Sequence, residues 1–247
     1  MAGRTSRTEA VVLRSLRLGE ADRVLHLYTL EGGRIGAVAK GIRRTKSRFG
    51  ARLEPLSHVE VMLHRGGGEL RTVTGVQLIR PHSAAREDGF RLAVGLVGSE
   101  AMLRLFGEPE ANPRAFEALT KFLDLLDELP PQSTRPALEP LVLSFQLKLL
   151  WLSGYLPHLT SCANCGRGDE LVGYSPQAGG AVCQDCANGA IVLSAAGREG
   201  IETLLSTPLA DARAAGLDDR STREALAVVT ASYEFHGGFR LRTVRSA

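Results

Sequence analysis

The hydrophobic pattern of the chain changes near Pro81, from the alternation typical of β-strands to the spacing typical of helices. Before that point, apolar and polar residues alternate, and Gly32-Gly33 and Gly66–Gly68 provide turn signals between neighbouring stretches. The pattern predicts five short strands, at residues 9–17, 23–30, 34–40, 58–64 and 69–79. Five short strands in so little chain favour a small β-barrel of the OB kind, and an SH3-like barrel fits the strand count nearly as well.

After Pro81, apolar residues recur at helical spacing, and such stripes are better explained by a shared helical core than by a cofactor site. Asn112-Pro113 reads as a helix start, and Ser221–Glu224 as a capping box that opens the last helix. Helices are expected over residues 84–106, 113–129 and 134–154, from Ser194 onward, and from 221 to 237. The predicted class is therefore α+β, with an OB-fold domain at 1–80 and an all-α helical domain at 81–247.

All four cysteines of the chain lie in two CxxC pairs, Cys162/Cys165 and Cys183/Cys186. Seventeen residues separate the pairs, which falls in the spacing range of tetrahedral zinc sites. Two residues between the cysteines of a pair let both thiolates turn toward one ion. The pattern predicts a closed four-sulfur zinc site with a structural role, one ion per chain. This zinc-ribbon-like module is expected at about residues 158–192, inserted in the helical domain.

Other uses of the cysteines are weaker readings. The N-terminus lacks a sustained apolar core, and the chain has no apolar run of about 18 residues, so neither a secretory signal nor a membrane span is expected. A reducing cytoplasm then favours metal ligands over disulfides. A redox site needs only one pair, and iron–sulfur motifs usually space their cysteines differently.

The net charge of +3 hides an uneven distribution along the chain. Residues 1–80 contain 15 Lys or Arg against 7 Asp or Glu, whereas acidic residues are in excess over 81–247. Much of the basic excess lies in residues 34–52, which contain no acid. This stretch is a candidate nucleic-acid interface, with Phe49 as a platform for a base and seven cations for phosphates. The cations are Arg34, Lys40, Arg43, Arg44, Lys46, Arg48 and Arg52. The simpler reading is a solvated basic loop.

Other function classes find less support in the sequence. The P-loop, HExxH and dinucleotide motifs are absent, so an enzyme is not expected. A zinc protein that reads DNA through its metal module is disfavoured, because Arg167 is the only basic residue between Cys162 and Cys186. A generic OB protein that binds single-stranded RNA or DNA, with a structural zinc site, remains the alternative.

The sequence resembles the bacterial DNA repair protein RecO family. The resemblance is carried by Lys40-Gly41-Ile42-Arg43-Arg44, by the run from Ser47 to Leu56, and by Gly154-Tyr155-Leu156-Pro157 leading into Cys162-Ala163-Asn164-Cys165-Gly166. It covers most of the chain, while the last 50 residues match only in general helical character.

The resemblance implies a cytoplasmic, nucleoid-associated recombination mediator built from an N-terminal OB-fold and a helical domain with an inserted zinc module. Such a protein binds single- and double-stranded DNA and anneals complementary strands. With RecR it helps load RecA onto DNA coated by single-strand-binding protein. The implied partners are therefore DNA, RecR, the C-terminal tail of single-strand-binding protein, RecA and RecF. Carried over by position, Lys40, Arg43, Arg44, Lys46 and Arg48 would contact DNA, and the four cysteines would hold the metal.

Overall fold

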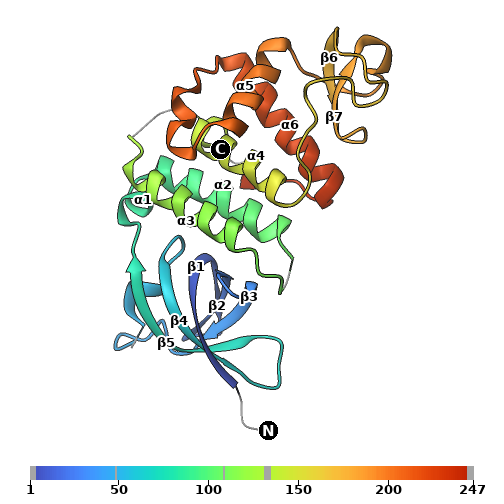
Figure 1. Ribbon diagram of the computed structural model, residues 1–247. Helices are drawn as coiled ribbons and strands as arrows, with labels where there is room; N and C mark the ends of the chain where they lie inside the picture. Colours follow the sequence, from blue (N-terminus) through green and yellow to red (C-terminus); the bar gives the residue numbers. More distant parts are fainter. Residues whose placement is uncertain (1–3, 48, 108, 131–134, 244–247) are drawn as a thin grey trace. The chain divides into compact units, whose positions relative to one another are not determined.

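The computed structural model describes residues 4–47, 49–107, 109–130 and 135–243. By their internal contacts, the residues form two compact units, residues 1–129 and residues 130–247 (Figure 1). Within the described residues, helices long and apolar enough to cross a membrane are absent.

The first unit is built on a closed five-stranded barrel with the strand order β1-β2-β3-β5-β4. The strands are β1 (Arg4–Leu18), β2 (Asp22–Thr29), β3 (Gly33–Ala39), β4 (His58–Arg65) and β5 (Arg71–Arg80). All pairs are antiparallel except β3 and β5, which run parallel, and β1 closes the barrel against β4. A closed five-stranded barrel with this mixed order is OB-like, as the sequence predicted.

Buried and partly exposed residues alternate along the strands, and the buried ones form the barrel core. On β3, Ile35, Ala37 and Ala39 are buried while the intervening residues are partly exposed. Leu25 and Leu27 of β2 and Val59, Val61 and Leu63 of β4 are also fully buried in the same core. The predicted inward faces of these strands are thereby confirmed, because a period of two puts every second side chain on one side of a sheet.

Three helices complete the first unit: α1 (Ser83–Glu87), α2 (Gly89–Leu105) and α3 (Pro113–Glu128). The single helix expected at 84–106 is wrong, because Asp88 adopts an extended conformation and ends α1. The Asp88 carboxylate accepts the N–H of Arg91 at 2.8 Å, so it caps a new helix. The start at Asn112 is confirmed, since its side chain accepts the Ala115 N–H at 3.0 Å. Strand gives way to helix near residue 80, as expected, but α1–α3 pack with the barrel.

The second unit contains α4 (Pro140–Leu152), α5 (Ala195–Ser206) and α6 (Asp219–Gly237). Helix α4 begins later than expected, because Pro140 occupies its first turn and only a short 3-10 turn, Pro136–Leu138, precedes it. The capping box at Ser221–Glu224 is wrong: Asp218 caps α6 by accepting the Ser221 N–H at 2.7 Å. Glu224 instead accepts the N–H and hydroxyl of Ser194 at 2.9 and 2.6 Å, which joins α6 to the start of α5.

The four cysteines lie between α4 and α5, around a small sheet with the order β7-β6-β8. Its strands are β6 (Leu171–Ser175), β7 (Gly180–Cys183) and β8 (Ile191–Val192), which lie within the range expected for the zinc-ribbon-like module. The Tyr174 hydroxyl of β6 forms a buried 2.7 Å hydrogen bond with Ser232 Oγ of α6. This bond ties the cysteine module to the helices of its own unit.

Candidate metal centre and candidate nucleic-acid interface

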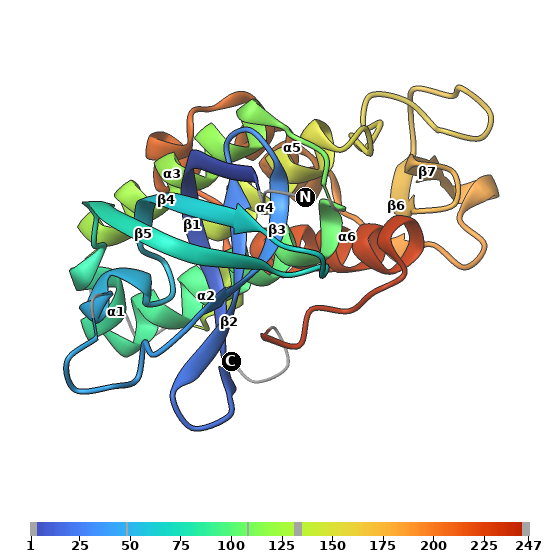
Figure 2. The same cartoon turned by 90° about the horizontal axis from the view of Figure 1, so that it is seen from below.

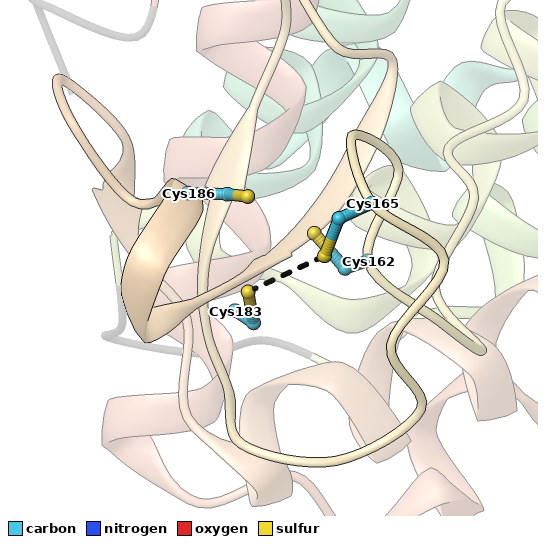
Figure 3. Close-up of side chains that lie close together, drawn as sticks. All are labelled: Cys162, Cys165, Cys183 and Cys186. Carbon is cyan, nitrogen blue, oxygen red and sulfur yellow. Dashed lines mark hydrogen bonds between the residues drawn. The ribbon is translucent and has the colours of Figure 1, made fainter.

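The four cysteine side chains converge on one point (Figure 3). Cys162 and Cys165 come from the loop after α4, Cys183 ends β7, and Cys186 follows in a short 3-10 turn. All four Sγ atoms lie within 4.8 Å of one another, and Cys165 Sγ is 3.7 Å from Cys183 Sγ. A tetrahedral zinc with bonds of about 2.3 Å places its sulfurs about 3.8 Å apart, so this spacing suits a bound ion. A disulfide needs about 2.05 Å, and all four cysteines are free.

The backbone prepares this geometry. Gly166 has φ +79° and donates its N–H to Cys162 O at 2.8 Å, which closes the turn around the first pair. Ala163 donates its N–H to Ala181 O of β7 at 2.8 Å and so fixes this turn beside the second pair. His158 is outside the cluster: its ring bonds to Ser161 Oγ at 2.7 Å. The group that could hold a metal ion therefore consists of the four cysteine sulfurs.

The protonation of the thiols is uneven. Backbone N–H groups, first that of Cys183, stabilise the Cys162 thiolate and lower its pKa to about 6. Hydrogen bonding to Cys183, together with burial and the other sulfurs, raises the pKa of Cys186 to about 12. Four adjacent thiolates repel one another strongly unless a cation lies between them. Metal binding must therefore release protons, and the affinity for the metal falls as the pH is lowered.

The basic stretch predicted as a nucleic-acid interface, residues 34–52, comprises most of β3 and the first part of the loop between β3 and β4, which we call the basic loop. Lys40, Arg43, Arg44, Lys46 and Arg52 are exposed on it, and Arg48 lies outside the described residues. Arg14 and Arg17, at the far end of β1, are exposed as well. Side chains of this kind and exposure can follow a phosphate backbone.

The turn between β1 and β2 holds the first part of this loop. Gly41, with φ +68°, donates its N–H to Asp22 Oδ1 at 2.7 Å. Arg43 donates its backbone N–H to Ala21 O at 3.0 Å and its guanidinium to Glu20 O at 2.9 Å. Figure 2 shows this turn projecting from the barrel beside the loop that follows β3. These contacts could not be predicted from the sequence, because hydrogen bonds between positions about twenty residues apart leave no signature in the local pattern.

Two residues predicted to contact nucleic acid, Phe49 and Arg34, make contacts within the protein instead. Phe49 is 1% exposed and packs in the barrel core with Ile42 and Leu53, so its prediction as a base platform is wrong. An aromatic ring beside the open end of a small barrel gains more from burial than from exposure to water. Arg34 is half-buried, and its guanidinium donates to Leu103 O of α2. Arg34 therefore joins β3 to α2, and the interface begins at Lys40.

Comparison with known proteins agrees with this description. The model of the family "Recombination protein O N terminal" matches residues 1–82, and that of "Recombination protein O C terminal" matches residues 86–245. The chain is similar to the DNA repair protein RecO of Rubrobacter xylanophilus, with 39% identity over 237 residues and 91% of each chain covered. Its counterpart in Streptomyces griseus subsp. griseus is 36% identical over 247 residues, with 97% of each covered. The relative from Cutibacterium acnes is 40% identical over 184 residues, with 74% of each covered. With both family models matched and relatives this similar over nearly its whole length, the chain belongs to the Recombination protein O (RecO) family of DNA repair proteins.

Proposed function

We propose that this protein is a DNA-binding recombination mediator that acts by binding and not by catalysis. The observation that carries the proposal is the exposed cation cluster of Lys40, Arg43, Arg44 and Lys46 on a loop held by the β1–β2 turn. The Arg43 guanidinium helps to anchor the loop at Glu20 O, while Lys40, Arg44 and Lys46 are exposed and can follow phosphates. Contacts of this kind do not depend on base sequence, so the protein binds both single- and double-stranded DNA.

Strand annealing follows from the same cluster. Two complementary strands repel each other through their phosphates, and a protein that neutralises phosphates lowers this repulsion while leaving the bases available for pairing. Family membership supports the rest of the proposal: in the cytoplasm, at the nucleoid, the protein acts with RecR to load RecA onto DNA coated by single-strand-binding protein, whose C-terminal tail it binds. RecF is a further proposed partner.

The proposed metal is one zinc ion per chain, held by Cys162, Cys165, Cys183 and Cys186. The spacing of the sulfurs and the all-thiolate donor set support zinc. Four protein ligands fill a tetrahedral ion, so its role is to hold the module together.

Charge reversal tests the DNA interface. The variant R43E/R44E/K46E should bind single-stranded DNA at least about 100-fold more weakly, because three phosphate contacts become repulsive. The slope of log affinity against log salt should become shallower by about 2, at roughly 0.7 per lost contact on a single strand. Fluorescence anisotropy with a labelled oligonucleotide measures both quantities, and a strand-annealing assay with and without single-strand-binding protein measures the activity.

The matched control is R114E/K121E/R223E, which makes the same change in net charge at exposed positions on α3 and α6. It should leave affinity within about twofold of the parent if local contacts and not overall charge dominate. Equal binding by the parent and R43E/R44E/K46E would overturn the assignment of the interface.

A further inference from the structure

The four sulfurs of the cysteine module differ in their access to water. Cys165 is exposed and Cys186 is partly exposed. Cys162 and Cys183 are buried, with exposed fractions of 2% and 0%. The oxidation of a thiolate depends on its exposure, because the oxidant arrives from solvent. Cys165 is therefore the corner of the cluster that a small oxidant reaches first.

A buried sulfur of the other CxxC pair lies within reach of Cys165. The Sγ atom of Cys165 is 3.7 Å from the Sγ atom of Cys183, at the end of β7 (Figure 3). A disulfide of about 2.05 Å requires the two atoms to approach by about 1.7 Å, which small side-chain rotations provide. An exposed thiol next to a buried one suits a reaction in which the first sulfur is oxidised and the second closes the disulfide.

The backbone around the cluster is held by bonds that do not involve a metal. Cys162 donates its N–H to Arg167 O at 2.7 Å, and Ala163 donates its N–H to Ala181 O of β7 at 2.8 Å. The guanidinium of Arg167 also donates to Asp185, between the cysteines of the second pair, at 2.8 Å. These bonds keep the two CxxC segments side by side when the sulfurs change partners, so the change is local and reversible.

We propose that Cys165 and Cys183 are a peroxide-reactive pair, in which a disulfide takes the place of the metal. The proposal rests on the zinc site proposed above and is independent of the DNA interface. Cys165 is the sulfur that peroxide attacks, and Cys183 is the sulfur that resolves the product. The module is then a site of reversible modification as well as a structural clamp.

The reaction takes one hydroperoxide and two thiolates. The Cys165 thiolate attacks one oxygen of hydrogen peroxide, the O–O bond breaks, hydroxide leaves, and the sulfur becomes a sulfenic acid. The Cys183 thiolate then attacks this sulfur, the S–O bond breaks, and a second hydroxide leaves. Two protons from solvent convert the hydroxides to water. The two sulfurs together lose two electrons, and one peroxide is reduced to two water molecules.

The disulfide removes two of the four metal ligands. Cys162 and Cys186 alone leave a tetrahedral ion two protein donors short, so zinc is released. The second unit then loses the stability that the ion supplies, because the module is joined to α6 through Tyr174 and Ser232. The basic loop belongs to the first unit, so its affinity for DNA is retained. A thiol reductant breaks the disulfide by exchange and restores the ligands.

Zinc release from the full chain measures this reaction. The zinc-loaded protein is treated with a small molar excess of hydrogen peroxide, and 4-(2-pyridylazo)resorcinol reports free zinc by its absorbance. About one zinc per chain should be released, and dithiothreitol with added zinc should restore the starting metal content. The two cysteines of each pair share one tryptic peptide, so fragmentation of the unreduced, alkylated peptides identifies the joined sulfurs. The expected bond is Cys165–Cys183.

Two histidine variants separate the exposed thiol from metal binding. C165H and C186H each keep three cysteines and one histidine, a ligand set that also holds tetrahedral zinc. C165H lacks the exposed thiolate, so peroxide should release its zinc at least about tenfold more slowly than from the parent. C186H keeps the reactive pair and should release zinc within about threefold of the parent rate. Zinc content before treatment is measured for both variants.

Limited alkylation of the parent tests the same order without any substitution. With less than one equivalent of iodoacetamide, Cys165 of the zinc-loaded protein should be labelled first and Cys183 last. Equal release rates in C165H and C186H, absence of the Cys165–Cys183 disulfide, or first labelling at a buried cysteine would overturn the proposal. If the untreated protein contains no zinc, the metal assignment is wrong, and disulfide mapping and labelling still decide whether these two sulfurs are the reactive pair.

Discussion

The basic loop and the cysteine module, for which we propose DNA and zinc as ligands, present their charged groups in opposite ways. In the module, four sulfurs within 4.8 Å face one another, and two of them are buried. The cations of the loop are instead exposed. The β1–β2 turn holds the loop by accepting the Gly41 N–H at the Asp22 carboxylate and the Arg43 N–H and guanidinium at backbone carbonyls. A compact cation needs a closed shell of ligands, whereas a polymer of phosphates needs an open surface that it can cross. The comparison predicts that changes in the module affect stability, and changes in the loop affect binding.

Loss of the metal ligands should have the largest effect. The variant C162S/C165S leaves two thiols without partners, so metal content should fall from about one zinc per chain to near zero. The melting temperature should decrease by roughly 10 °C or more, because a structural ion contributes directly to folding. DNA affinity should stay within about threefold of the parent, since the cations proposed to bind phosphates lie in the other unit.

Elemental analysis, thermal melting and anisotropy measure these three quantities. N164A/Q184A is the matched control, because both side chains are exposed within the same CxxC segments and neither is a metal ligand. A large loss of DNA affinity in C162S/C165S with an unchanged melting temperature would show that the module itself contacts DNA.

The anchor of the basic loop should have an intermediate effect. Asp22→Asn keeps an oxygen that accepts the Gly41 N–H and removes a negative charge near the DNA, so D22N should bind at least as tightly as the parent. Asp22→Ala removes charge and acceptor together, and the loop loses its bond at Gly41. D22A should therefore bind oligo(dT) about threefold more weakly than D22N. Identical affinities of the two variants would rule out a positioning role for Asp22.

A single charge reversal in each region should show the smallest effects. Arg167 of the cysteine module donates to Asp185 at 2.8 Å, so its charge is already balanced there. R167E should change DNA affinity by less than about twofold, whereas R44E, at an exposed position in the loop, should weaken it by roughly fivefold. Both are read from anisotropy titrations at one salt concentration. A loss in R167E as large as that in R44E would place DNA on both regions.

Hydrophobic alternation and residue spacing correctly predicted the features that depend on interactions between residues close together in the sequence. Alternation placed Ile35, Ala37 and Ala39 in the barrel core, and the spacing of the cysteines predicted that all four would lie in one cluster. Gly32-Gly33 marked the β2–β3 turn, where Gly33 has φ +62°. These features depend on backbone geometry over a few residues, so the sequence is sufficient to find them.

The predictions were wrong where the local sequence allows several arrangements and contacts between residues distant in the sequence select one of them. Glu224 has the spacing of a capping box, but it bonds to Ser194, thirty positions away, while Asp218 caps the helix. Phe49 lies among cations in the sequence, yet its ring is buried in the barrel core. Asp22 and Gly41 meet only because β2 and β3 pair.

The sequence by itself determined the barrel, the approximate positions of most helices and the grouping of the four cysteines, because periodicity and residue spacing act over short stretches of chain. Only the tertiary structure decided which residues of the basic stretch are exposed, what anchors them, and which of the four cysteines is open to solvent. Cys165 and Cys183 belong to different CxxC pairs, and their sulfurs come within 3.7 Å only when the turn after α4 bonds to β7. A linear pattern treats the four cysteines alike, but the packing of the module decides which thiol remains in water.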